Sequence, residues 1–337
     1  MDEVEVLQAS WRRLAAQRRL EDEPFGCTAD AGVWDDVPAQ LAHGLLLRDA
    51  WSSVLQSDQV KGVLCGDDLN YHTRLPLLLA QREGLIAIYC SHGALDNGFF
   101  FKRSLADAFL VKGEMERDYL ERAAGVDCEK VFVGAPVDGT FGSGHESTRD
   151  AVVFFSQPYE VTGGRPDSIY HEIVPRLYSM ARSTAKKLII KLHPFESRRA
   201  RQALVSSVLA GINCHDIEIV EGVPPETVIS RAWCGLTVDS SVAVECALNG
   251  VPCFLCGWLD FTGDGYLQQF ARFGVARALG SAEEISRIPQ MVSEFCPDPA
   301  KRKLISREID KKLLDEILFG GRRVGLNSHR VNLSGAG

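Results

Sequence analysis

The alternation of short apolar runs with amphipathic helical stretches constrains the fold of this chain most. From residue 60 onward each apolar run ends in glycine or polar residues, and a helical pattern follows before the next run begins. Strands separated by helices pair in parallel through right-handed crossovers, and helices then cover the faces of the sheet. The pattern therefore predicts an α/β protein built on parallel sheets.

The expected strands fall into two groups on either side of a segment without periodicity. In the first half we expect strands at 60–65, 85–90, 108–111 and 130–133, with helices at 74–83 and 115–123. In the second half we expect strands at 151–155, 187–192, 217–220, 235–238 and 252–256, with helices at 226–231, 242–248 and 301–318. Residues 1–55 have a helical pattern, with one weak strand candidate at 4–7.

A chain of 337 residues exceeds what one hydrophobic core usually supports. Residues 137–150 are rich in glycine and polar side chains, which is typical of a linker. We therefore predict two Rossmann-type, doubly wound parallel-sheet domains that face each other across a cleft. The first covers 1–140 and includes the helical N-terminal segment, the second covers 150–320, and 321–337 form a loose tail.

Composition excludes several classes of function. A net charge of -8 argues against a nucleic-acid-binding surface. The N-terminus is acidic, and no apolar run approaches the ~20 residues that a membrane span needs. We therefore expect a cytoplasmic protein without stable membrane insertion, either free or peripheral at the inner membrane. The ten cysteines are scattered as in proteins of a reducing compartment. No Asp-x-Asp follows a strand of the second domain, so we expect chemistry that needs no metal.

Polar, anion-competent side chains follow two strands of the second domain. Lys191 and His193 stand in Lys-Leu-His-Pro at the end of one strand, and Ser240 and Ser241 lead into the helix expected at 242–248. The carboxyl edge of a parallel sheet binds ligands, because loops diverge there and helix N-termini present unpaired N–H groups. These residues predict a site for a phosphate-bearing, nucleotide-activated ligand.

A glycine-bearing loop follows the first strand of the second domain. It begins at Gln157 and contains Gly163 and Gly164, which allow backbone N–H groups to approach a phosphate. Ordinary turns also use paired glycines. The other site residues have structural alternatives too: His193 before Pro194 can fix a turn, and the serine pair can cap a helix.

Five short motifs together resemble the GT-B fold glycosyltransferases of bacterial surface and capsular polysaccharide synthesis. They are Ser-His-Gly at 91–93, Gly-x-Pro-x-Asp at 134–138, Gln-Pro at 157–158, Lys-x-His-Pro at 191–194 and Ser-Ser-x-x-x-Glu at 240–245. Within that class the chain resembles the capsule-type Kdo transferases and sialyltransferases with a His-Pro motif, and the glycerophosphotransferases of teichoic acid assembly. It is also similar in architecture to the hydrolysing UDP-N-acetylglucosamine 2-epimerases. The resemblance covers roughly residues 60–320.

This resemblance implies transfer of a sugar or sugar acid from a CMP-, UDP- or CDP-linked donor to a hydroxyl of a glycan or lipid-linked acceptor. The first domain would bind the acceptor and the second the nucleotide sugar, with no further cofactor. His193 would donate a hydrogen bond to the donor phosphate, which Ser240 and Ser241 would also hold. Glu245 would accept from ribose hydroxyls, although it can equally be a solvated residue or an arginine partner.

An acceptor hydroxyl needs a general base, because an unassisted alcohol is a poor nucleophile at neutral pH. His92, at the end of an expected strand, is the first candidate, since its ordinary pKa suits a base at neutral pH. Asp67 and Asp68 are the competing candidates, and one of them can instead cap the following helix. Two other functions stay open: a UDP-sugar 2-epimerase-like isomerase, and a non-catalytic nucleotide-sugar-binding or assembly protein.

Overall fold

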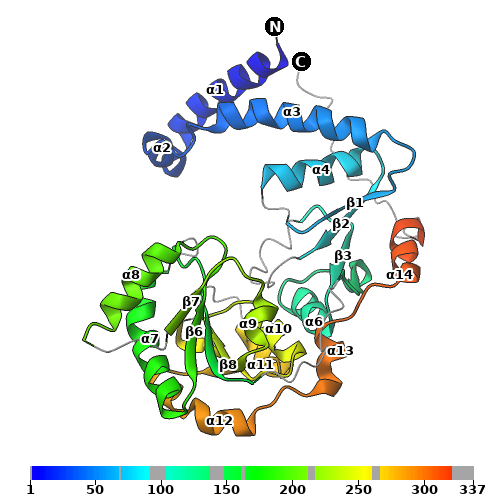
Figure 1. The fold of residues 1–337 in the computed structure, drawn as a ribbon. Coiled ribbons are helices and arrows are strands. Elements are labelled where there is room, and N and C mark those ends of the chain that lie inside the picture. Colours follow the sequence, from blue (N-terminus) through cyan, green and yellow to red (C-terminus); the bar gives the residue numbers. More distant parts are fainter. Residues whose placement is uncertain are drawn as a thin grey trace. The chain divides into compact units, whose positions relative to one another are not determined.

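The chain is represented by a computed structural model, in which contacts divide it into two compact units (Figure 1). The structure describes residues 2–67, 70–91, 104–136, 148–160, 164–211, 217–259 and 266–320. Unit 1 consists of Met1–Cys90, Ser104–Phe109 and Leu314–Gly337, and unit 2 consists of Ser91–Arg103 and Leu110–Leu313. Most of the predicted linker, and the tail at 321–337, lie outside the described residues, so the domain boundaries at 140 and 150 stay a prediction.

Three helices form the N-terminal part of unit 1. They are α1 (Glu3–Glu21), α2 (Glu23–Asp30) and α3 (Val37–Leu55). Asp22 accepts a hydrogen bond from the backbone N–H of Phe25 and so caps α2, and the Phe25 ring stacks on Trp34 with 5.3 Å between centroids. The strand candidate at 4–7 is wrong, because these residues lie within α1. Its first turn is closed by the Glu5 carboxylate, which accepts from the N–H of Asp2.

A four-stranded sheet follows these helices in the chain. Its strands are β1 (Gly62–Cys65), β2 (Ile86–Cys90), β3 (Ala108–Val111) and β4 (Val131–Val133), in the order β1-β2-β3-β4. β1 and β2 pair in parallel, with α4 (Tyr71–Arg82) between them in sequence, and α6 (Glu114–Arg122) lies between β3 and β4. In unit 1, Val63 and Ala87 from the strands pack with Leu77 and Ala80 of α4. The expected crossover pattern is thus present.

Unit 2 contains a six-stranded sheet in which every pair is parallel. Its strands are β5 (Ala151–Phe155), β6 (Lys187–Lys191), β7 (Ile217–Val220), β8 (Ala232–Thr237), β9 (Cys253–Cys256) and β10 (Arg277–Leu279). Their order, β10-β9-β8-β5-β6-β7, is the doubly wound Rossmann order. The strand order reverses between β5 and β8, which is where such sheets form their ligand-binding crevice.

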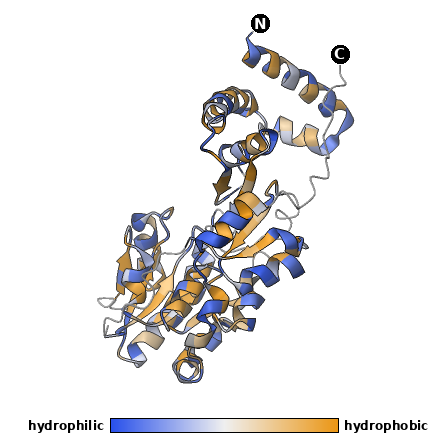
Figure 2. Ribbon diagram, turned by 90° about the vertical axis from the view of Figure 1, so that its right-hand side faces the viewer, coloured by the Kyte–Doolittle hydropathy of each residue, from blue (hydrophilic) through white to orange (hydrophobic). Residues whose placement is uncertain are grey.

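Helices supply the other half of the unit 2 core. They are α7 (Pro166–Ser183), α8 (Arg198–Val208), α9 (Pro225–Ile229), α10 (Val242–Leu248), α11 (Tyr266–Arg272) and α12 (Ile288–Glu294). Ile173 and Leu177 of α7 are fully buried and share one cluster with Phe154, Ile190 and Phe254 of the sheet. Figure 2 shows the strands as mainly hydrophobic, as expected where helices cover both faces of a parallel sheet.

The prediction of one helix at 301–318 is wrong. The segment contains α13 (Arg302–Ile305), α14 (Lys311–Asp315) and a π-helical turn at Glu316–Gly320. Between α13 and α14 the backbone is extended, and Glu308 forms a parallel bridge with Ala135. The N–H of Arg307 also donates to the carbonyl of Lys112. These tertiary backbone bonds replace the helical ones, so the amphipathic pattern does not decide the structure here.

β10 was not expected from the sequence, because a run of three residues gives no periodicity. It pairs with β9 at the edge of the sheet.

Among the described residues, no helix combines the length and apolar character needed to cross a membrane.

Candidate functional site

The carboxyl ends of β8, β5 and β6 are adjacent in the sheet, and each leads into polar residues. Ser156 and Gln157 follow β5, Asp239 follows β8, and His193 stands two residues beyond β6. The parallel register places Phe155 opposite both Lys191 and Thr237. The sequence motifs that predicted a ligand site therefore meet at one edge of the sheet, at the switch point.

Gln157 joins the two loops at the switch point. Its Nε2 donates to Oδ1 of Asp239 at 2.6 Å, and its Oε1 accepts from the N–H of Asp239 at 3.2 Å. The Thr237 hydroxyl lies 3.3 Å from the same Oε1. The amide group thus links the two loops, and ligand binding by Gln157 stays a prediction.

His193 is half-buried in the turn after β6. Its Nδ1 accepts a hydrogen bond from the backbone N–H of Phe195 at 3.2 Å. Burial holds the imidazole pKa below its ordinary value; Glu196 opposes this shift, and Lys191 adds to it. The ring is therefore neutral at neutral pH, so it can offer one N–H donor to a ligand without carrying a positive charge.

Lys191 is the last residue of β6, and its side chain is buried. Its Nζ donates to the carbonyl of Leu192 at 2.6 Å. Burial lowers the pKa of the ammonium group, while Glu196 and Glu245 act in the opposite direction. An ammonium group has three N–H donors, so this one bond leaves capacity for an anion.

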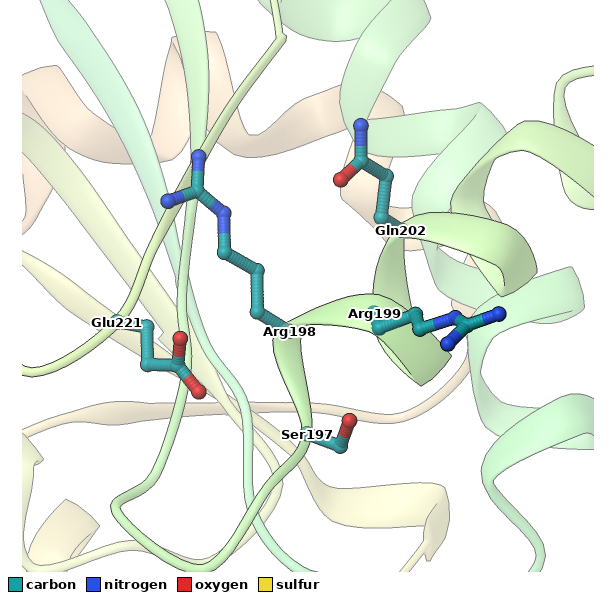
Figure 3. A pocket seen from close by; sticks show the side chains of 5 residues that line it. All are labelled: Ser197, Arg198, Arg199, Gln202 and Glu221. Carbon is teal, nitrogen blue, oxygen red and sulfur yellow. The ribbon is translucent and has the colours of Figure 1, made fainter.

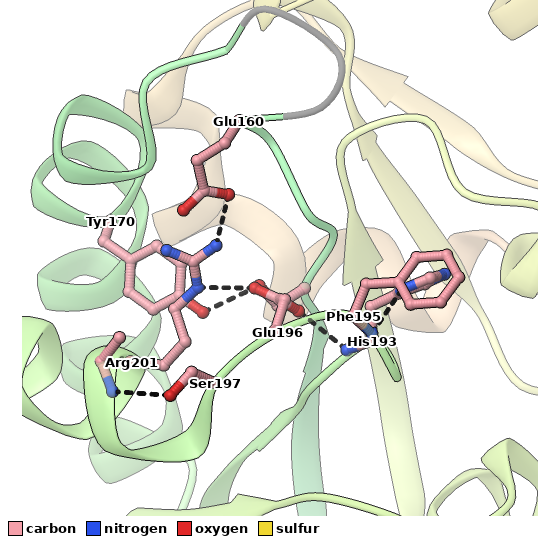
Figure 4. A network of polar contacts seen from close by, with 9 residues as sticks. Glu160, Tyr170, His193, Phe195, Glu196, Ser197 and Arg201 are labelled. Atoms are coloured by element: carbon pink, nitrogen blue, oxygen red, sulfur yellow. Dashed lines mark hydrogen bonds and ion pairs between the residues drawn. The ribbon is translucent and has the colours of Figure 1, made fainter. Parts of the chain in front are cut away.

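Glu196 organises the turn that carries His193, and the sequence did not identify it. Its side chain is 0% exposed. Oε1 accepts from the Ser156 hydroxyl at 2.7 Å and from Nε of Arg201 at 2.6 Å, and Oε2 accepts from the backbone N–H of His193 at 2.7 Å. Figure 4 shows the carboxylate between Arg201 and the His193 turn. A glutamate ahead of a helix suggests only a cap, so its local sequence gave no signal of this role.

The serine pair after β8 is half-buried at the start of α10. The Ser240 hydroxyl accepts from the backbone N–H of Val242 at 3.3 Å, as a helix-initiating serine does. Ser241 is the residue before the helix, but its hydroxyl makes no capping bond. The capping alternative therefore accounts for Ser240 and not for Ser241, and phosphate binding by either stays a prediction.

Glu245 lies one turn into α10, and its pKa is raised to about 7. Burial is the largest cause, and Glu226 adds to it, while Lys112 and Lys191 act in the opposite direction. Glu245 is half-buried, so whether it acts as a solvated carboxylate or binds a ligand stays open. At neutral pH the group can donate or accept a proton, which strongly perturbed carboxyl groups in functional sites commonly do.

The glycine loop after β5 is only partly described. The N–H of Gly164 donates to the carbonyl of Tyr159 at 2.8 Å, and a Cβ at Gly164 would meet Cβ of Tyr159 at 3.2 Å. This glycine therefore closes the loop tightly, and in this conformation its N–H is already used. Gly163 lies outside the described residues, and phosphate binding by the loop stays a prediction.

Of the three candidate bases, Asp67 alone is among the described residues. Its Oδ2 accepts from Nδ2 of Asn70 at 2.6 Å. Asn70 in turn caps α4, since its Oδ1 accepts from the N–H groups of His72 and Thr73. Asn70, and not Asp67, thus caps this helix. His92 and Asp68 lie outside the described residues.

A cavity of about 550 Å³ lies at the start of α8. It is lined by Ser197, Arg198, Arg199, Gln202 and Glu221. Arg198 extends between Gln202 and Glu221, and Arg199 points away from Glu221 (Figure 3).

In the described part of the chain, no three side chains of His, Cys, Asp or Glu gather in a way that could hold a metal ion.

No protein-family model matches the chain, and no curated protein is significantly similar to it in sequence. Several solved structures are similar in fold. The UDP-GlcNAc 2-epimerase from Neisseria meningitidis bound to UDP-GlcNAc has 13% identity over 82% of this chain and 78% of that chain, with a TM-score of 0.52. The S. aureus MnaA structure with UDP has 14% identity over 83% and 79%, with a TM-score of 0.52. The chain has a GT-B fold.

A putative UDP-N-acetylglucosamine 2-epimerase from Listeria monocytogenes is also similar, with 12% identity over 82% of this chain and 76% of that chain and a TM-score of 0.51. At these identities the likeness establishes the fold alone. The predicted fold class, with two parallel-sheet α/β parts, is confirmed, as is the architectural likeness to UDP-N-acetylglucosamine 2-epimerases. The finer resemblance to His-Pro-containing capsule enzymes and teichoic-acid glycerophosphotransferases stays a prediction.

Proposed function

We propose that this chain is a glycosyltransferase that uses a nucleotide-activated sugar or sugar acid, bound at the carboxyl edge of the six-stranded sheet. The observation that supports the proposal is that His193 follows the carboxyl end of β6, while Ser240 and Glu245 follow that of β8, and these two strands flank β5 at the switch point. A doubly wound sheet binds nucleotides at this position. A half-buried imidazole, hydroxyl groups and a carboxylate are groups that recognise phosphate and ribose.

The donor phosphate would lie between His193 and the serine pair. The imidazole N–H and the hydroxyls of Ser240 and Ser241 would donate hydrogen bonds to its oxygens, and Lys191 would add positive charge nearby. Negative charge grows on the leaving nucleotide as the glycosidic bond breaks, so these donors stabilise the transition state more than the bound donor. The leaving group would thus be stabilised by protein donors.

Glu245 would accept hydrogen bonds from the ribose hydroxyls. Its carboxylate is the stronger acceptor when ionised, and with a pKa of about 7 it is about half ionised at neutral pH. A bound ribose would favour the ionised form, because hydrogen bonds to the charged form lower a pKa. Nucleotide binding would then release a proton from this group.

A hydroxyl of a surface glycan or lipid-linked glycan would attack the donor sugar. The enzyme would reach this acceptor from the cytoplasm, without stable membrane insertion. His92 is the proposed base for this hydroxyl, with Asp67 and Asp68 as the alternatives. No metal has a part in this scheme, since the phosphate is met by His193, Lys191 and hydroxyl donors.

A second candidate function is epimerisation of a UDP-sugar at C2. The observation that favours it is the fold likeness to UDP-GlcNAc 2-epimerases, such as the one from Neisseria meningitidis bound to UDP-GlcNAc. Epimerisation needs acid and base groups on both faces of the sugar. It would convert the nucleotide sugar without any acceptor.

The deciding experiment incubates the chain with CMP-, UDP- and CDP-sugars, with and without an extract of surface glycans and lipid-linked glycans. Nucleotide release that depends on the extract supports the transferase, and a changed sugar without extract supports the epimerase. His193→Ala should abolish either reaction. The matched control is His171→Ala, which removes an exposed imidazole from α7. Binding without conversion under every condition would leave a nucleotide-sugar-binding or assembly protein.

A further inference from the structure

A buried polar network links the loop after β5, the turn after β6 and helix α8 (Figure 4). Its centre is Glu196, which accepts from the Ser156 hydroxyl, from Arg201 and from the backbone N–H of His193. The guanidinium of Arg201 and the backbone N–H of His193 can only donate hydrogen bonds, so the Glu196 carboxylate is the acceptor in both.

The direction of each hydrogen bond in the network is fixed. Ser156 has one hydroxyl proton, which it donates to Glu196. Its oxygen lies 2.8 Å from the Tyr170 hydroxyl, so Tyr170 must be the donor to Ser156. Arg201 donates to Glu196 through Nε and to Glu160 through Nη2 at 2.9 Å. Glu196 is thus held by donors from two elements outside its own turn.

The same turn determines which nitrogen of His193 carries the proton. Glu196 fixes the backbone N–H of His193, and the N–H of Phe195 donates to Nδ1 of the ring. A neutral imidazole carries a single N–H, and the nitrogen that accepts a hydrogen bond cannot be the one that bears it. The proton therefore resides on Nε2.

We infer that Glu196, anchored by Arg201, is a positioning residue that holds His193 as the Nε2–H tautomer. In this tautomer the free end of the ring is a hydrogen-bond donor. It can bind an oxyanion such as a phosphate, but it cannot take a proton from an acceptor hydroxyl. The use of this donor on a nucleotide rests on the proposed function, whereas the tautomer is a property of the chain alone.

The experiment is two-bond ¹H–¹⁵N correlation spectroscopy of the full chain with ¹⁵N-labelled histidine, without any ligand. The chain has eight histidines, and His193→Ala identifies the signals of His193. In wild type we expect the Nε2–H pattern. In Glu196→Gln the turn loses an acceptor and a charge, so we expect the pattern to become a mixture of tautomers. The pKa of the ring should also fall, because Glu196 raises it and Lys191 lowers it.

Glu160→Gln is the matched control, since it changes the exposed carboxylate that also pairs with Arg201 and leaves the Glu196–His193 bond in place. It should retain the wild-type pattern. An Nδ1–H pattern in wild type would overturn the inference even if no variant folds. An unchanged tautomer and pKa in folded Glu196→Gln would overturn it as well. A fixed tautomer in a chain that binds no nucleotide would instead refute the proposed function alone.

Discussion

Replacing Arg201 with methionine should destabilise unit 2 strongly, because it leaves Glu196 as a buried charge without its cation. The side chains of Arg201 and Glu196 are 6% and 0% exposed, and Nε lies 2.6 Å from Oε1. Removing one partner of such a pair costs about 3–5 kcal/mol. With a urea m-value of about 3 kcal/mol/M, the unfolding midpoint should fall by roughly 1–1.7 M. Urea titration followed by near-UV circular dichroism measures this shift.

Arg231→Met is the matched control for this variant. Arg231 also pairs with two carboxylates, those of Asp150 and Glu218, but its side chain is 33% exposed. Exposed pairs contribute about 0–1 kcal/mol, so the midpoint should move by no more than roughly 0.3 M. Equal shifts in Arg201→Met and Arg231→Met would refute the reasoning. The double variant Arg201→Met with Glu196→Leu should recover most of the loss, because it buries no unpaired charge.

Three further predictions concern Glu245 and the packing. Because the pKa of Glu245 is raised to about 7 by folding, its neutral form stabilises the chain at low pH, and this contribution is lost as pH rises from about 4.5 to 7. The free energy of unfolding of Glu245→Gln, relative to that of wild type, should therefore rise by about 1–3 kcal/mol from pH 5 to pH 8, as urea midpoints at the two pH values measure. A difference between the two proteins that stays the same at both pH values would contradict this. Phe154→Ala should reduce the stability of the fold by about 3–5 kcal/mol, because the ring is fully buried. Phe195 is 81% exposed, so Phe195→Ala should change the stability by no more than about 0.5 kcal/mol. Thermal unfolding measures both changes, and similar losses in the two variants would contradict the core assignment. Gly113→Ala places a Cβ 2.5 Å from a backbone carbonyl oxygen and should destabilise the fold by about 1–3 kcal/mol. Gly44 lies in a helix with open space around it, so Gly44→Ala should stabilise the fold by about 0.5–1 kcal/mol. A more stable Gly113→Ala than Gly44→Ala would refute the close approach of the backbone at Gly113.

Most strands of unit 2 were predictable, and in β5, β6, β8 and β9 the reason is burial on both faces, which makes them nearly continuous apolar runs. β5, β7 and α10 begin and end where the sequence pattern placed them. The helix expected at 301–318 failed for a tertiary reason, since backbone bonds to Lys112 and Ala135 hold its middle extended. No periodicity in a segment reveals such a partner.

The candidate site was predictable where it depends on strand ends. His193 and Ser240 lie two and three residues after the ends of β6 and β8, so the carboxyl edge of the parallel sheet carries both. Gln157 illustrates the limit, because its bonds to Asp239 depend on β5 lying beside β8, and the local sequence does not encode strand order. Glu196 illustrates it further, since one of the donors that hold its buried carboxylate lies 40 residues earlier in the chain.

Isothermal titration of CMP, CDP, UDP, UMP and GDP into wild type, His193→Ala and the control His171→Ala tests the central claim most directly. We predict that at least one nucleotide binds wild type and His171→Ala equally. Its affinity for His193→Ala should be about ten- to a hundredfold weaker, as expected for the loss of a hydrogen bond to a charged group. Binding of none of these nucleotides to wild type, or equal binding to His193→Ala, would contradict a phosphate site at the His-Pro turn.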